Sequence, residues 1–567
     1  MNPSQPRTPN SAQGSPFLRL ARIGSILLAY LPLFAIPAAP FQVTVLDADS
    51  GNRLPCRVHL RSDSGTWIFP QSIDPAGSAL PYREQWVPMP GSEDQHSTVS
   101  AHPFGANLEP GTRYALEIEH GKEYLPHRDS FVMSGEPIRR TVRLQRFSKA
   151  SALGWFSGET HVHRRIVELT NVMQAEDLNV AFPVTFWTTR SDRAPNLAPS
   201  NLRSQGPSPF GPREDRGTHP LWIDSHHVIV PRNTEYEIFS LGPRRHTLGA
   251  LFLLNHQSVP DLLAPPIRPI AERAHAEGAL LDLDKHNWPW SLMLVPVAKV
   301  DLFELSNNSV WRTRFGFNQA PEPLPEWMPV ERDSPNTLTE WGWLQYGFNV
   351  YYALLNSGFP IAPTAGTASG VHPVPLGHSR VYVQTGDALD LDAWLAGLKA
   401  GRSFVTTGPM LFARLNQQWP GHRFSHDKAD PWKGEITIEA IGARPISTVE
   451  IIVNGRVAHR FEPTPERTAA GAWSTKQRQS VALSSSAWVA VRCIETQPDG
   501  RKRFAHTGSW WITLGNQPVR PRREEVQWLV RRMQSEIERQ RPILAPEALA
   551  EFEQARDAYE ALLPQSQ

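Results

Sequence analysis

Hydrophobic and polar residues alternate along two separate parts of the chain, one near each end. Residues 42–46 and 114–119 carry apolar side chains at every second position, and residues 435–440 and 488–493 repeat this period. Successive side chains of a strand point to opposite faces, so the pattern is typical of half-buried β-strands. It predicts two β-sandwich-like domains, at residues 41–150 and 410–515.

The middle of the chain has a different pattern. Short apolar runs at 180–184, 251–254, 279–283 and 299–304 alternate with segments of helical period, chiefly 267–277 and 341–356. Strand after helix after strand indicates an α/β domain with a parallel sheet, either open or closed into a barrel. We expect this domain to span residues 151–409.

Helical spacing returns at the C-terminal end. Val526, Leu529, Met533 and Ile537 recur at intervals of three and four residues, and Leu549, Phe552, Tyr559 and Leu562 recur at intervals of three and seven, which is also helical spacing. This spacing predicts two amphipathic helices within residues 516–567, packed as a hairpin.

The N-terminus has the layout of an export signal. Arg19 and Arg22 precede an apolar run at residues 23–39 that ends in small side chains. Pro40 and Ile36 disfavour cleavage near Ala38, so residues 1–40 are either a cleaved signal peptide or a membrane anchor. Both alternatives place the protein outside the cytoplasm, as a periplasmic, secreted or membrane-anchored chain.

Composition narrows the class of partner. The formal net charge of the 567-residue chain is +1, which provides no field for nucleic acid or for an anionic membrane surface. The chain has two cysteines, too few for a disulfide framework or a cysteine-rich zinc site. The sequence does not decide whether Cys56 and Cys493 form a disulfide, and it does not decide the oligomeric state.

Candidate metal chemistry centres on two histidines one residue apart, His161 and His163. In an extended strand both imidazoles face the same side, where they can bind a divalent ion, although hydrogen-bonded structural histidines are the plainer interpretation of so short a motif. Further ionisable groups follow apolar runs along the middle domain. The candidate ligands are His161, His163, Glu235, Glu237, His246, His286 and His372, and the candidate catalytic residues are Asp284 and Lys285.

Three motifs together resemble a known superfamily. Residues 158–163, Gly-Glu-Thr-His-Val-His, resemble the opening motif of the polymerase-and-histidinol-phosphatase (PHP) superfamily, and residues 278–287 resemble its later histidine motif. Residues 401–409 are similar to a signature of its carbaryl-hydrolase-like (CehA/McbA) branch. The resemblance implies a distorted (β/α)7 barrel, a divalent metal ion (Zn, Mn or Fe), and hydrolysis of an ester, a carbamate or amide, or a phosphoester in a small-molecule or glycan-like substrate.

The chain departs from the superfamily at two places. Residues 185–187 are Thr-Phe-Trp where Thr-Asp-His is usual, and Ala368 stands where an aspartate is usual. Two functions therefore stay open. In the first, Asp284 takes a proton from a metal-activated water and Lys285 neutralises the developing charge. In the second, the barrel is catalytically decayed and acts as an extracytoplasmic binding protein, for example for carbohydrate.

Overall fold

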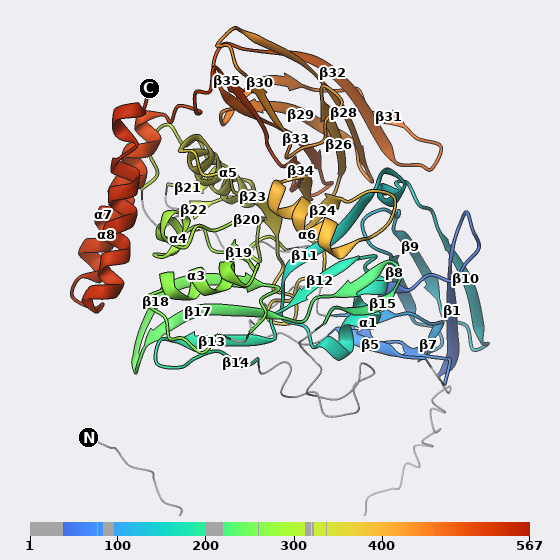
Figure 1. The fold of residues 1–567 in the computed structure, drawn as a ribbon. Coiled ribbons are helices and arrows are strands. Elements are labelled where there is room, and N and C mark those ends of the chain that lie inside the picture. The colour runs from blue at the N-terminus through green and yellow to red at the C-terminus, as the bar shows by residue number, and fades with distance from the viewer. Residues whose placement is uncertain are drawn as a thin grey trace, which may run out of the picture.

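The structure is a computed structural model that describes residues 38–75, 77–82, 96–198, 219–258, 260–311, 319, 323–335 and 337–567. The predicted export signal lies almost entirely outside these ranges. Within them, no helix has both the length and the apolar character needed to cross a membrane. The protein is a strand-rich α/β chain built from several sheets, with a pair of helices at its C-terminal end (Figure 1).

The N-terminal part forms two facing sheets, in the strand orders β10-β1-β7-β4 and β5-β6-β2-β8-β9, with β3 paired to β2. Its strands are β1 (Ala39–Asp47), β2 (Cys56–Ser62), β3 (Trp67–Ile68), β4 (Gln71–Ser72), β5 (Ala79–Tyr82), β6 (Ser97–Ser100), β7 (Phe104–Leu108), β8 (Arg113–Glu119), β9 (His127–Val132) and β10 (Ile138–Leu144). Phe41, Val43 and Val45 of β1 are buried against Val58 and Leu116, which confirms the predicted alternation.

The central part contains two sheets. One runs β15-β16-β12-β11-β24-β25 and continues into the C-terminal part, and the other runs β14-β13-β17-β18-β19-β20-β23. The strands are β11 (Trp155–Val162), β12 (Val180–Pro183), β13 (Phe186–Arg190), β14 (Asn196–Leu197), β15 (Leu221–Asp224), β16 (His227–Ile229), β17 (Asn233–Leu241), β18 (Arg244–Leu254), β19 (Leu280–Leu283), β20 (Leu302–Ser306), β23 (Ala362–Ala365), β24 (Arg380–Gln384) and β25 (Ser403–Thr406). A small hairpin, β21 (Arg332–Ser334) and β22 (Thr337–Leu338), lies outside both sheets.

The prediction of a parallel sheet is wrong for part of this region. β17 and β18 are antiparallel, as are β18 and β19, whereas β19, β20 and β23 are parallel. The reason is the connection between β17 and β18, which consists only of Gly242 and Pro243. Two residues can join antiparallel strands but cannot make the long crossover that parallel strands need. Among the described residues, the ladders form two sheets and not one closed barrel.

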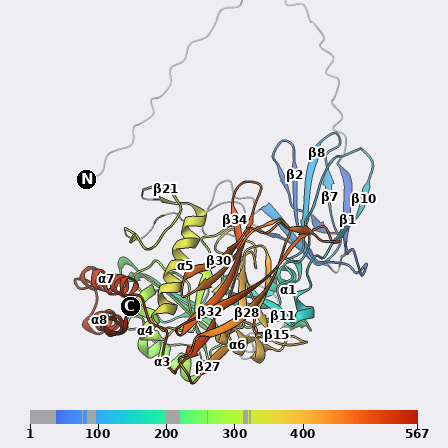
Figure 2. The ribbon, with the colours of Figure 1, turned by 90° about the horizontal axis from the view of Figure 1, so that it is seen from above.

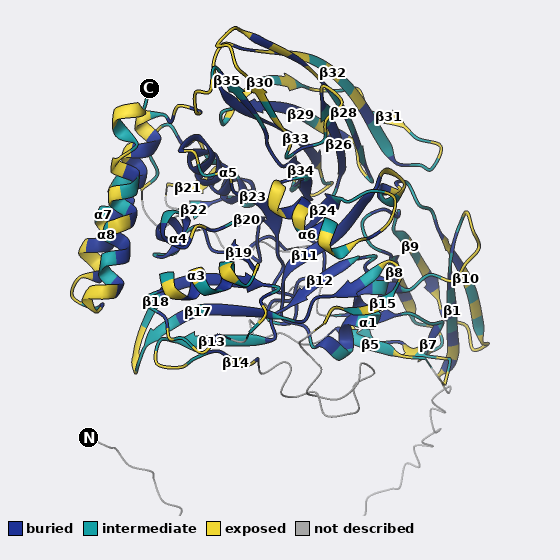
Figure 3. Ribbon diagram, in the orientation of Figure 1, coloured by how far each residue is buried: buried dark blue, intermediate teal, exposed yellow. Residues whose placement is uncertain are grey.

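Five helices cover the central sheets: α1 (Ile166–Ala175), α3 (Arg268–Ala276), α4 (Ser291–Ala298), α5 (Glu340–Asn356) and α6 (Leu391–Ala400). Of these, α3 and α5 confirm the helices predicted at 267–277 and 341–356. The start of α5 and the end of α6 follow ordinary capping chemistry. The Thr339 side chain accepts a hydrogen bond from Gly342 N at the start of α5, and Gly401 ends α6 with φ 71°. Strands β11, β12, β19 and β20 are dark blue in Figure 3 because these helices and sheets exclude them from solvent.

The C-terminal β-part is joined to the central part through a shared sheet, since β25 pairs with β34. Its strands are β26 (Met410–Leu415), β27 (Arg423–His426), β28 (Trp432–Gly442), β29 (Ile446–Val453), β30 (Arg456–Phe461), β31 (Glu466–Arg467), β32 (Trp473–Leu483), β33 (Ala487–Thr496), β34 (Lys502–Thr507) and β35 (Trp510–Leu514). Asn454 and Gly455, with φ 48° and 77°, form a tight turn between β29 and β30, and an Asn-Gly pair is a sequence signal for such a turn.

The predicted helical hairpin is present as α7 (Arg523–Gln540) and α8 (Pro546–Glu560). Buried side chains such as Leu529, Met533 and Phe552 join it to the core of the central part, and the Tyr559 hydroxyl donates to Leu292 O of α4 at 2.7 Å. The hairpin lies along the side of the central part away from the N-terminal sandwich (Figures 1 and 2). Cys56 and Cys493 are both free and buried, so they do not pair.

Candidate metal centre

The two motif histidines meet at the end of β11, which is buried along its whole length. His161 is 1 % exposed and His163 is 5 % exposed. As the alternation of strand side chains predicts, their rings lie side by side, with the two Nε2 atoms 3.2 Å apart. Val162, between them, is fully buried in the opposite direction, in the cluster of side chains around α1.

A carboxylate completes the first group of convergent ligands. Glu235 lies on β17, and its Oε2 is 3.3 Å from His163 Nε2. The side chain is fully buried, and neither carboxylate oxygen accepts a hydrogen bond from the described residues. His161 and His163 therefore each present a ring nitrogen, and Glu235 presents a carboxylate oxygen, to a common point. The spacings of these three atoms suit a bound ion.

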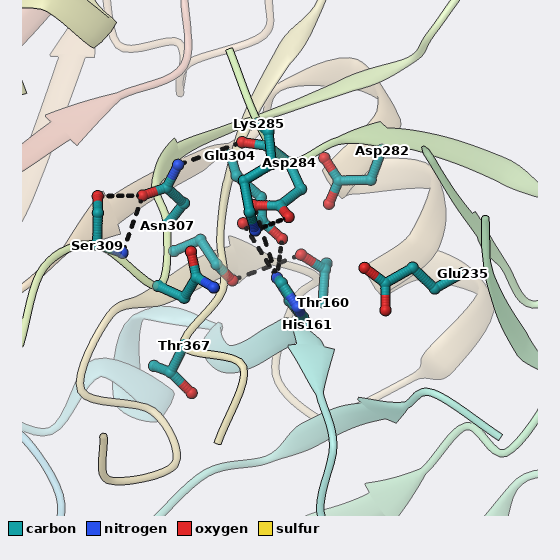
Figure 4. Close-up of polar contacts among 12 residues, drawn as sticks. Thr160, His161, Glu235, Asp282, Asp284, Lys285, Glu304, Asn307, Ser309 and Thr367 are labelled. Atoms are coloured by element: carbon teal, nitrogen blue, oxygen red, sulfur yellow. Dashed lines mark hydrogen bonds and ion pairs between the residues drawn. The ribbon is translucent and has the colours of Figure 1, made fainter. Parts of the chain in front are cut away.

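A second group shares His161 but uses its other ring nitrogen. His161 Nδ1 is 3.1 Å from Glu304 Oε1 and 3.8 Å from Asp284 Oδ1. Glu304 comes from β20, and Asp284 follows β19. Figure 4 shows these two carboxylates and Lys285 gathered beside the His161 ring, while Glu235 approaches from a different strand. Lys285 is ion-paired with Asp284 Oδ2.

Burial shifts the protonation of these groups strongly. It raises the pKa of Glu235 well above its ordinary range, and the neighbouring Glu237 raises it further. Burial, with Asp284 and Asp282, does the same to the pKa of Glu304. Burial lowers the pKa of His161 to about 3. Without a bound cation, burial therefore favours a neutral imidazole at His161 and neutral carboxyl groups at Glu235 and Glu304.

Asp284 and Lys285 stay charged because they are partners. Burial alone would raise the pKa of Asp284, but Lys285 and His161 lower it below its ordinary value. Burial alone would lower the pKa of Lys285, but Asp284, Glu237 and Glu304 raise it. This single ammonium group compensates only part of the negative charge that the surrounding carboxylates carry once they ionise.

The donor set fits a divalent ion. Two imidazole nitrogens bound at about 2.05 Å in a tetrahedral arrangement lie roughly 3.3 Å apart, close to the 3.2 Å between His161 Nε2 and His163 Nε2. Glu304, next to Nδ1 of His161, is placed to fix that ring so that Nε2 keeps its lone pair, as carboxylates behind metal-bound histidines do. Mixed nitrogen and oxygen ligands suit Zn, Mn and Fe.

Other predicted ligands lie near this centre but outside both groups. Glu237 is two residues along β17 from Glu235, and its pKa is raised by burial to about 7. The His372 ring is buried near Trp311, and both Lys285 and Asp284 influence its pKa, which burial lowers to about 3.

His286 is surrounded by aromatic side chains and belongs to neither of the two groups of convergent ligands. Its ring centroid is 5.1 Å from that of Trp343, 5.3 Å from Tyr346 and 5.9 Å from Phe303. The residue is 5 % exposed, and neither ring nitrogen has a hydrogen-bond partner among the described residues. His286 thus lies outside both groups of convergent ligand atoms, and its role as a ligand stays a prediction.

His246 must be removed from the ligand set. It stands at the start of β18, beside the turn that joins β17 to β18, and its Nε2 is 2.6 Å from Gln540 Oε1 of α7. Phe252, at the other end of the same strand, is the β18 residue that contacts the His161 ring. The prediction placed His246 at a strand end without knowing which end of the strand faces the site.

Two carboxylates important to the site were not among the predicted site residues. Glu304 interrupts an otherwise apolar run, Leu302 to Leu305, and a charge inside so buried a strand is the signal that could have identified it. Glu159 is the acidic residue of the opening motif. It is fully buried, and its carboxylate accepts hydrogen bonds from Thr367 N and Gly377 N, so it fixes the segment 366–377.

The departures from the superfamily pattern have clear structural positions. Trp187 stands in register with Glu235 on the paired strand, and its ring is 4.9 Å from that of His163. Ala368 is buried, has φ 50°, and donates from its backbone N to His161 O at 2.9 Å. Both positions therefore adjoin the motif histidines, but neither provides a ligand atom.

Comparison of the chain with protein-family models, with curated proteins and with solved structures finds no match in any of the three. The relation to the PHP superfamily stays a prediction that rests on the motifs alone. The described residues themselves establish a buried centre of histidines and carboxylates at the meeting point of β11, β17, β19 and β20, and this centre is able to hold a metal ion.

Proposed function

We propose that the protein is an exported metal-dependent hydrolase that acts on an ester, a carbamate or amide, or a phosphoester. The observation that carries the proposal is the convergence of His161 Nε2, His163 Nε2 and the unpartnered Glu235 carboxylate on one buried point. Three buried ligand atoms without a protein cation between them cost folding free energy that a bound divalent ion would offset.

The residues around the centre suit hydrolysis. A divalent ion bound there would supply an acidified water and polarise a carbonyl or phosphoryl oxygen. Asp284 is ionised, so it can accept a proton, and the Lys285 ammonium beside it can stabilise negative charge that develops on the substrate. Glu304 orients His161, and His286 offers an imidazole to the bound molecule.

We further propose that the two central sheets form a distorted barrel of the PHP type. β12 and β13 belong to different sheets but are separated only by Val184 and Thr185, so the chain passes directly from one sheet to the other. On the opposite side, the segment after β23 reaches β11 through the bond from Ala368 N to His161 O. These two junctions support a ring of strands around the metal centre.

Ala368 supports a second candidate function, a catalytically decayed barrel that binds an extracytoplasmic ligand such as a carbohydrate. An alanine at this position, adjoining His161, removes a carboxylate that the resembling superfamily places there. Metal alone does not distinguish the two functions, because a binding protein can keep its ion. Turnover does distinguish them.

The test combines metal analysis with a substrate screen. Protein purified without added metal should contain near-stoichiometric divalent ion, and the His161→Ala/His163→Ala double variant should contain none while keeping its circular dichroism spectrum. His246→Ala is the matched control and should keep the metal. The wild type should hydrolyse at least one of an aryl ester, an aryl carbamate and an aryl phosphate. Metal without hydrolysis of any of them would favour the binding protein, and metal retained in the double variant would refute the assigned site.

A further inference from the structure

The N-terminal sandwich packs against the central part of the molecule, and Tyr82 is one of the side chains that it buries there. Tyr82, the last residue of β5, is fully buried, and it belongs to the same apolar cluster as Val162 of β11 and Leu376. The guanidinium carbons of Arg164 and Arg57 lie 3.6 Å and 4.5 Å from the centroid of its ring. A residue of the predicted N-terminal sandwich is thus packed directly behind β11, the strand that carries the motif histidines.

Among the described residues, the Tyr82 hydroxyl is bonded to the segment 366–377 alone. It donates to Val374 O at 2.7 Å and accepts from Leu376 N at 3.2 Å, and it also contacts the Ser369 hydroxyl. A phenolic oxygen can donate one hydrogen bond and accept others, so these contacts use its full capacity. A single hydroxyl therefore fixes three points of this segment.

The same segment holds the backbone of the two histidines. His163 N donates to Ser369 O at 2.8 Å, and Ala368 N donates to His161 O at 2.9 Å. Gly370, with φ 103°, lies so close to His163 that an added Cβ would stand 2.6 Å from its carbonyl oxygen. A shift of the segment must therefore move the backbone from which both imidazoles project.

We propose that Tyr82 is a positioning residue for the metal centre: it holds the segment 366–377, and through it the spacing of His161 and His163. The part that concerns metal rests on the proposed function, whereas the part that concerns the segment does not. The N-terminal sandwich then contributes to the geometry of the site, and the domain is more than an appended module.

The test is Tyr82→Phe, which keeps the ring and its packing against the two arginines but removes the hydroxyl. The matched control is Tyr559→Phe, because Tyr559 is also fully buried and also donates to a backbone carbonyl, Leu292 O, but it lies in the C-terminal hairpin. Hydrogen exchange of metal-free protein reports on the segment. The absorption spectrum and affinity of bound Co²⁺ report on the ligand geometry.

In Tyr82→Phe, amides of residues 366–377 should exchange at least about tenfold faster, because two buried backbone groups lose their partner. Exchange in β28 and β32 should not change. The Co²⁺ spectrum should shift and the affinity should fall by about 10–100-fold, as when groups behind metal ligands are removed. The control should match the wild type in both measurements.

Unchanged exchange in residues 366–377 would overturn the proposal. Faster exchange with an unaltered Co²⁺ spectrum and affinity would overturn the positioning role, since the segment would then move without moving the histidines. If the wild type binds no Co²⁺, the proposed function fails, and the exchange data alone still decide whether Tyr82 holds the segment.

Discussion

Glu235→Gln is the sharpest perturbation of the candidate centre. The substitution keeps the shape of the side chain and removes its ability to ionise. Burial raises the pKa of Glu235 well above its ordinary range, so burial favours a neutral carboxyl group there in the metal-free wild type. The carboxylate oxygens also have no hydrogen bond to lose among the described residues. The metal-free variant should therefore be about as stable as the metal-free wild type.

With metal, the two proteins should differ greatly. Loss of a group behind a metal ligand lowers affinity by about 10–100-fold, so loss of a ligand should cost at least about 100-fold. At a free metal concentration 100 times the wild-type Kd, binding stabilises the wild type by about 2.7 kcal/mol and the variant by about 0.4 kcal/mol. For a unit the size of residues 151–409, about 260 residues at about 2.1 cal/mol/K each, the difference of about 2.3 kcal/mol corresponds to roughly 4 °C in Tm.

The assay is thermal unfolding with and without metal, followed by a signal from the central part, with the Kd measured by competition against a chelating dye. Glu551→Gln is the matched control. Glu551 is also buried with a raised pKa, but it accepts hydrogen bonds from Ile267 N and Arg268 N at the start of α3, away from the site. If metal stabilises Glu235→Gln as much as the wild type, Glu235 is not a ligand.

The same structure and sequence support four further predictions. Asp284→Asn should keep metal on His161, His163 and Glu235 but lower turnover by about 10²–10⁴-fold, as the loss of a general base does. The control is Asp282→Asn, whose parent side chain accepts a hydrogen bond from the Thr364 hydroxyl, and it should lose far less turnover. Equal losses of turnover in the two variants would contradict the assignment. In urea unfolding, metal-free protein should lose stability as pH rises from about 4 to 7. Burial raises the pKa of Asp282 and of Glu237 to about 7, so the folded state binds more protons than the unfolded state over this range. Over the same pH range metal affinity should rise, since ligand carboxyl groups must ionise to bind. Finally, fractionation of the native host should find the chain outside the cytoplasm, and full-length soluble protein in the cytoplasm would refute export.

Local patterning accounts for the elements that the sequence predicts well. The alternation in β1 and β28, the helical spacing in α7, and the Asn454-Gly455 turn are each decided by neighbours within a few residues. Such features depend on the side-chain period and on turn chemistry, and both can be read directly from the amino-acid sequence. The side-by-side placement of His161 and His163 belongs to this class, because a strand fixes it without any other part of the fold.

Long-range features were out of reach for the same reason. The direction of β18 depended on recognising that Gly242 and Pro243 make the whole connection, and the error on His246 followed from it. Glu304 enters the centre only because β20 lies beside β19, and Tyr82 only because the sandwich docks against α1 and the segment 366–377. The spacing of residues along the sequence does not predict these long-range contacts, because they depend on how the sheets pack against each other.

The strongest reason to expect function here is the electrostatic cost of the site. Glu235, Asp284 and Glu304 are all fully buried, and Lys285 is the cation that faces them. A fold selected only for stability would replace such groups with apolar residues of similar volume, which is often neutral or stabilising. When a core is apolar elsewhere but holds several buried charged groups at one place, that place is expected to be a functional site. Since imidazole nitrogens 3.2 Å apart share that place, the cost is best explained by a divalent ion that the carboxylates are kept to bind.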